Sequence, residues 1–187
     1  TGSPVGSEII VNSEYSWLKR GIIDVSLTPE GFVVAWPAYG YPDNAIYGRR
    51  FDMSGAPVAA EFRVDTGRYP EYASVDSDAT GRFVVAWTDY AHDGDLSGYG
   101  TFARAFEFDE TPNGAQFLVN TETSRMQGIS GPGVAVAPNG DFVIVWDSSP
   151  DQDGDGYGIF GQRFVLSTAC STTPLPGCQQ PTVPLTA

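Results

Sequence analysis

Basic residues are scarce in this sequence, and long apolar runs are missing. Ten Lys and Arg stand against 23 Asp and Glu among 187 residues, so the formal net charge is −13. Binding to phosphate backbones or to anionic lipid requires clusters of Lys and Arg. We therefore expect no nucleic-acid partner. No apolar run approaches the roughly 18 to 20 residues that cross a bilayer, so we also expect no membrane insertion.

Catalytic side chains are sparse as well. The single histidine, His92, lies in an expected loop beside Asp93 and Asp95, and no nucleophile accompanies it at a spacing typical of a Ser/His/Asp or Cys/His set. A glycoside hydrolase needs two carboxylates paired across a cleft, and the sequence singles out no such pair. We expect a protein that is not an enzyme, with a glycoside hydrolase as the least favoured alternative.

Only two cysteines are present, Cys170 and Cys178, in the Thr/Pro-rich tail formed by residues 167–187. Seven residues separate them, and they form neither a CxxC redox motif nor a zinc set. The pair predicts a disulfide and an extracellular or cell-surface location. The alternative is two unpaired thiols in a disordered tail. Because the sequence begins at Thr1 and not at Met, we expect a processed product or a fragment.

A repeated unit makes up most of the remaining chain. Three segments align, "GFVVAWPAYG" from Gly31, "GRFVVAWTDY" from Gly81 and "GDFVIVWDSS" from Gly140. Each has a turn glycine, an apolar run rich in β-branched residues, and then Trp36, Trp87 or Trp146, so the period lies between fifty and sixty residues. A tryptophan at the same place in every repeat predicts core packing, with sugar stacking as the alternative.

Three further pieces recur around each tryptophan segment. They are "IIDVSL", "YASVDS" and "GVAVAP" before it, "YGRRF", "FARAF" and "FGQRF" after it, and then "EFRVDT" and "QFLVNT". An unpaired copy of the last piece, "EIIVNS", starts at Glu8. The pieces predict repeats at 13–66, 67–121 and 122–166, with an N-terminal strand at 8–12 that completes the last one.

The pattern of these pieces predicts strands. Apolar and polar residues alternate with a period of two, Val, Ile, Phe and Tyr are enriched, and Gly, Asn, Asp and Pro lie between the runs. Turns such as "PNGD" at Pro138 stand where a hairpin must reverse. We expect an all-β chain of three four-stranded antiparallel repeats with almost no helix.

The last repeat, "GDFVIVWDSSPDQDGDGYGIFGQRF", resembles the tandem repeats of large bacterial surface and secreted proteins, whose units read G-x-FVVxW, acidic Gly-rich loop, GIxxQxF and ExxVNT. The resemblance covers most of residues 8–166 and implies β-propeller-like blades and a surface or extracellular role. The first repeat departs from the pattern where the acidic loop belongs, and a closed propeller has four to eight blades. A β-trefoil, with twelve strands in three repeats, is the alternative fold.

The acidic loops predict a calcium site. Asp151, Asp153 and Asp155, followed by Gly156, match the opening of a D-x-D-x-D-G loop, in which alternate carboxylates converge on a hard cation. The second repeat keeps Asp93 and Asp95. Flanking strands exclude a helical EF-hand, so Ca²⁺ would be held by a strand-connecting loop. The alternative is a solvated Asp-Gly turn.

Three functional classes remain. Repetition, acidity and the missing catalytic set favour a non-catalytic structural or adhesive module. Exposed Tyr39, Tyr41, Tyr90 or Tyr99 beside the acidic loops would instead suit a calcium-dependent lectin that binds glycans. The N-terminal strand and the last repeat are complementary ends, and an unpaired strand edge invites another strand. That strand could close the last repeat of its own chain or that of another copy. We expect the second, so that the protein assembles with other copies of itself through that strand.

Overall fold

A computed structural model describes residues 2–13, 21–39, 44–67, 69–90, 98–123, 126–149 and 152–166. Within these ranges the chain forms strands and no helix, which confirms the predicted all-β class. The strands are β1 (Asp24–Thr28), β2 (Gly31–Ala38), β3 (Ala45–Asp52), β4 (Phe62–Arg63), β5 (Pro70–Ser77), β6 (Phe83–Tyr90), β7 (Tyr99–Phe106), β8 (Phe117–Leu118), β9 (Gly133–Val136), β10 (Asp141–Ser148) and β11 (Gly158–Val165).

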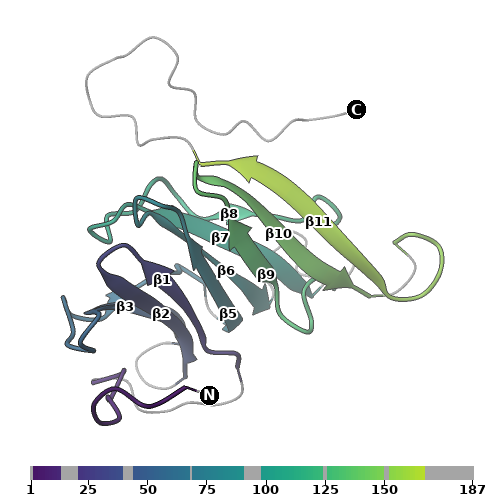
Figure 1. Ribbon diagram of the computed structural model, residues 1–187. Coiled ribbons are helices and arrows are strands. Elements are labelled where there is room, and N and C mark those ends of the chain that lie inside the picture. Colours follow the sequence, from purple (N-terminus) through teal and green to yellow (C-terminus); the bar gives the residue numbers. More distant parts are fainter. Residues whose placement is uncertain are drawn as a thin grey trace.

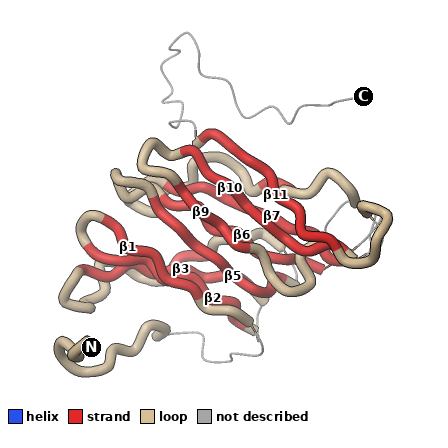
Figure 2. Tube along the Cα trace, turned by 45° about the vertical axis from the view of Figure 1, so that its right-hand side comes forward, coloured by secondary structure: helices blue, strands red, loops and turns tan. Residues whose placement is uncertain are grey.

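Three antiparallel sheets follow one another along the chain. The first has the order β1-β2-β3-β4, the second β5-β6-β7-β8, and the third β9-β10-β11. Figures 1 and 2 show them side by side in chain order, with β1 to β3 at one end and β11 at the other. The array is open, because among the described strands the first sheet packs on the second and the second on the third, without closing into a ring. No described segment is a helix that could cross a membrane.

Tight turns set the register at the start of each central strand. Before β6, Asp78 accepts hydrogen bonds from the backbone N–H groups of Thr80 and Arg82 at 2.8 and 3.1 Å, which closes the turn through Gly81. Gly81 and the equivalent Gly140 have φ values of +85° and +93°, a region that side chains with a Cβ rarely adopt. Gly81 and Gly140 therefore mark hairpin turns, as predicted, whereas Gly31 is the first residue of β2.

The core lies between the sheets, and the repeated tryptophans form one face of each sheet. The tryptophan face of the second sheet, with Phe83, Val85 and Trp87, packs on the opposite face of the first. The tryptophan face of the third sheet packs on the opposite face of the second in the same way. Trp36, Trp87 and Trp146 are all buried, so their prediction as core residues is confirmed.

Polar contacts join the first strands of the sheets. Ser26 on β1 donates to Asp76 on β5 at 2.9 Å, and Ser74 on β5 donates to Asp24 on β1 at 3.0 Å. Asp76 also accepts the backbone N–H of Val136 on β9 at 2.7 Å. These bonds fix how each sheet sits against the next.

The N-terminal segment does not form the strand that the sequence predicts. Residues 8–12 are not a strand, and they lie against the first sheet, where Val11 packs on the buried cluster that contains Trp36. The third sheet consequently has three described strands, and the expected fourth is missing from it. The reason is distance, because the third sheet lies at the other end of the open array (Figure 1).

Candidate functional site

The outer face of the third sheet is open. In the first and second sheets, the side chains at the equivalent register positions are buried between sheets. Ile46 on β3 and Ile159 on β11 stand at the same register position, opposite Pro37 and Asp147 respectively. Ile46 is 0% exposed, whereas Ile159 is 77% exposed. Val145 is 43% exposed, and its counterpart Ala86 is fully buried. Apolar residues thus remain on a face that no further described sheet covers.

The edge of this sheet is open as well. In the first two sheets the third strand pairs with a short fourth strand, β3 with β4 and β7 with β8. β11 pairs only with β10 among the described strands. An edge of eight residues presents a row of backbone donors and acceptors, which is a template for another strand.

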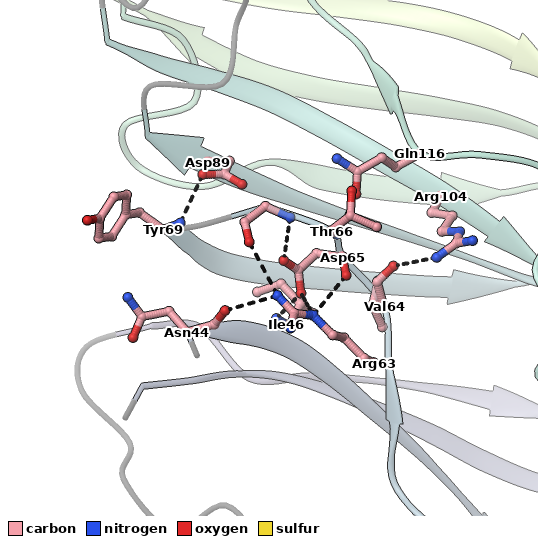
Figure 3. A network of polar contacts seen from close by, with 11 residues as sticks. Asn44, Ile46, Arg63, Val64, Asp65, Thr66, Tyr69, Asp89, Arg104 and Gln116 are labelled. Atoms are coloured by element: carbon pink, nitrogen blue, oxygen red, sulfur yellow. Dashed lines mark hydrogen bonds and ion pairs between the residues drawn. The ribbon is translucent and has the colours of Figure 1, made fainter. Parts of the chain in front are cut away.

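The N-terminal segment repeats the contacts of β4 at the opposite end of the array. Arg49 donates from Nη1 to the carbonyl of Val11 at 2.9 Å. Arg104, the equivalent residue on β7, donates from Nη1 to the carbonyl of Val64 at 3.1 Å (Figure 3). Val64 follows β4, and "EFRV" ending at Val64 aligns with "EIIV" ending at Val11.

A second pair of contacts agrees with the first. The backbone N–H of Ser13 donates to the Glu61 carboxylate, and the Ser13 hydroxyl donates to the same oxygen at 2.9 Å. The backbone N–H of Thr66, which aligns with Ser13, donates to Oε1 of Gln116, which aligns with Glu61, at 2.7 Å. The segment 8–13 therefore sits on the first sheet as residues 61–66 sit on the second.

A side-chain cap closes each fourth strand. Asp65 accepts the backbone N–H of Ile46 at 2.7 Å (Figure 3). Asn120 accepts that of Thr101 at 2.8 Å. Burial raises the pKa of Asp65, although the N–H of Ile46 and the guanidinium of Arg63 favour its charged form. Asn12 aligns with both caps in the sequence.

Tyrosines gather at one end of the first two sheets. Tyr90 contacts Tyr69 and Tyr99 edge-on, with ring centroids 6.5 and 5.1 Å away. Burial and the nearby Glu71 carboxylate raise the pKa values of Tyr39 and Tyr99. Of the four tyrosines expected at a glycan site, the structure thus brings Tyr39, Tyr90 and Tyr99 into one cluster, while Tyr41 lies outside the described residues.

Tyr72 adds backbone strain to this cluster. Its φ is +55°, which is unusual for an aromatic residue, and it lies at the irregularity in pairing between Glu71 and Ser74. Sequence reasoning missed Tyr72 and Glu71. In the repeat alignment Tyr72 takes the place of Ile22, so one bulky residue replaces another and no local signal marks the strain.

Few of the predicted calcium ligands fall in the described part of the chain. Asp153 and Asp155 are exposed, and Asp153 accepts the backbone N–H of Asp155 at 3.2 Å, which is the geometry of an Asp turn. Asp151, Asp93 and Asp95 lie outside the described residues, as do Cys170 and Cys178. In the described ranges no three His, Cys, Asp or Glu side chains are grouped to hold a metal ion.

Comparisons with family models, with curated proteins and with solved structures give no match for this chain.

Proposed function

We propose that this protein is a non-catalytic extracellular module with a structural or adhesive role, whose copies associate end to end into a surface or filament assembly. The observation that supports it is the contrast between Ile46, buried between two sheets, and Ile159, exposed at the end of the array. Val145 and Ile159 keep an apolar face where a terminal sheet would be expected to be polar. A further sheet from another copy would bury them.

In this proposal the sheets are propeller-like blades. Strand order within each sheet follows the chain, and the first strands β1, β5 and β9 lie next to one another. That arrangement favours propeller-like blades around a common axis, and it does not favour the paired hairpins of a β-trefoil. Three sheets form only an arc, so further blades from other copies would extend it.

Mass in solution at increasing concentration tests the association. Val145→Asp with Ile159→Asp should leave a monomer, because two carboxylates would be buried at the junction. Val5→Asp is the matched control, since Val5 is 98% exposed and lies outside the sheets. The control should assemble like the unchanged protein. A monomer at every concentration for the unchanged protein would contradict the proposal.

A second candidate function is calcium-dependent glycan binding. The cluster of Tyr69, Tyr90 and Tyr99 near Glu71 supports it, because aromatic rings stack on sugar faces and a carboxylate accepts sugar hydroxyls. Binding to a glycan array, with calcium and with chelator, is the test. Tyr90→Ala should abolish binding, and Tyr157→Ala, which changes an exposed tyrosine outside the cluster, should not.

A further inference from the structure

We propose that residues 8–13 of one copy add to β11 of a second copy as the fourth strand of its third sheet. This rests on the end-to-end association proposed above and names the element that joins the copies. The segment already lies where the outer strand of a preceding sheet would lie, because its contacts to Arg49 and Glu61 match those of 64–66 to Arg104 and Gln116. The third sheet of a second copy would take the place of this preceding sheet.

The register follows from the two complete sheets. Tyr47 pairs with Arg63 and Phe102 pairs with Leu118, so the alignment places Ile10 opposite Phe160. Val64 donates its N–H to the carbonyl of Ile46 at 2.8 Å, and Val119 donates to Thr101 at 2.8 Å. Val11 would then donate to the carbonyl of Ile159.

Asn12 completes the pairing. Asp65 and Asn120 accept the N–H of Ile46 and of Thr101, and the residue at that register position on β11 is Ile159. Asn12 of the first copy would accept the Ile159 N–H of the second copy. The same addition would pair Ile10, which is 83% exposed in the single chain, with a strand.

A second copy is the occupant because the chain's own segment is out of reach. Residues 8–13 lie against the first sheet, and β11 forms the far edge of the third (Figures 1 and 2). Each copy therefore offers one donor segment and one open edge, on opposite ends. Such a head-to-tail contact closes into a ring or continues into a filament. Because each copy carries −13, association should strengthen with salt.

Photo-crosslinking of the full chain tests the contact directly. A benzoylphenylalanine at Ile10, an exposed site, is activated in an equal mixture of ¹⁴N- and ¹⁵N-labelled protein. Mass spectrometry should find links between differently labelled copies that end at residues 158–162. The same probe at Val5, which is 98% exposed and outside the segment, is the matched control and should give no such links.

The cap gives a second and independent measurement. Asn12→Ala leaves the Ile159 N–H unpaired and should weaken association by about tenfold or more. Asn12→Asp should restore it, because Asp65 fills the same role in the first sheet. The melting temperature of each variant as a monomer shows whether the substitution affects folding, and weaker association with a folded monomer is the expected result.

The crosslinking and Asn12 experiments distinguish strand addition between copies from the alternatives. Links from Ile10 to 158–162 of another copy, with the Asn12→Asp rescue, establish the strand addition. Links within one copy would mean self-closure and overturn it. Links between copies at other residues would overturn the strand addition and leave end-to-end association standing. A protein that stays monomeric would overturn both.

Discussion

Trp146 donates from Nε1 to Oε1 of Gln127 at 2.9 Å, and both side chains are buried. Trp87, at the same place in the second sheet, has no acceptor for its buried Nε1 in the described part of the chain. The position equivalent to Gln127 is Pro70, since the two pair with Ser148 and Asp89 respectively. Equivalent tryptophans therefore differ in hydrogen bonding, because one repeat carries an amide where the other carries a ring without donor or acceptor.

Gln127→Leu should lower the free energy of unfolding by about 1 to 3 kcal/mol, since it removes the acceptor from a buried indole N–H. Gln127 also donates to Ser148 at 3.1 Å, and that bond is lost too. Urea unfolding measures the change. Gln162→Leu, at an exposed glutamine, is the control and should stay within about 0.5 kcal/mol of the unchanged protein. Equal urea midpoints for both variants would contradict a stabilising role for the hydrogen bond between Trp146 and Gln127.

Asp65 and Asn120 hold equivalent backbone groups, so Asp65→Asn should stay within about 1 kcal/mol of the unchanged protein at neutral pH. Asp65→Ala should lose about 1 to 3 kcal/mol, because the buried N–H of Ile46 loses its acceptor. Urea unfolding of the three proteins in the same buffer makes the comparison.

The same site predicts a pH dependence. Burial raises the pKa of Asp65 above its unfolded value, so the folded protein binds more protons between the two values. The free energy of unfolding should therefore rise, relative to Asp65→Asn, as pH falls through the raised pKa. Unfolding at pH 7 and at about pH 4.5 measures the difference. A relative stability that falls on acidification would mean that the Ile46 and Arg63 contacts outweigh burial.

Gly128→Ala should be strongly destabilising. Gly128 has a φ of +71°, and an added Cβ would lie 2.5 Å from Thr101 Oγ1 and 2.9 Å from Thr88 Oγ1. Gly114→Ala is a matched control, because its φ is +94° and nothing lies within 4 Å of the added carbon. The control should lose about 1 kcal/mol from the backbone alone. Thermal or urea unfolding should show a clearly larger loss of stability for Gly128→Ala than for Gly114→Ala. Equal losses would mean that the structure around Gly128 adjusts to the added methyl group at no cost in stability.

Calcium should stabilise the protein if Asp151, Asp153 and Asp155 bind it in the folded state. At about 100 times the dissociation constant the gain is about 2.7 kcal/mol, which raises the melting temperature. Asp153→Asn with Asp155→Asn should remove that shift, and Asp109→Asn, at an exposed carboxylate in another turn, should keep it. Identical melting in calcium and in chelator would leave the loop as a solvated turn.

Thiol titration of the unfolded, unreduced protein tests the predicted bridge. With Cys170 joined to Cys178, no free thiol should react, and reduction should release two. A bridge over so short a loop contributes at most about 2 to 3 kcal/mol by the chain-entropy estimate, confined to the tail. The three sheets should therefore melt unchanged after reduction. Two thiols before reduction would contradict the bridge and the argument for an oxidising location that depends on it.

Local patterns in the sequence were enough to locate the strands. The segments around Trp36, Trp87 and Trp146 became β2, β6 and β10. Gly81 and Gly140 fell where hairpins reverse, whereas Gly31 is the first residue of β2. Alternation with a period of two and a turn glycine act within a few neighbouring residues. The sequence also pointed to three of the tyrosines that meet near Glu71, although it could not pair them.

Contacts between distant residues decided the rest. Ile46 and Ile159 read alike in the sequence, and only the packing of whole sheets makes one buried and the other exposed. The segment 8–13 reads as a strand, but a strand needs a partner, and the open array places its segment beside Arg49 and not beside β11. Local sequence determined where strands form. Which faces and edges stay uncovered depended on how sheets stack across forty or more residues of chain, for which no local pattern carries a signal.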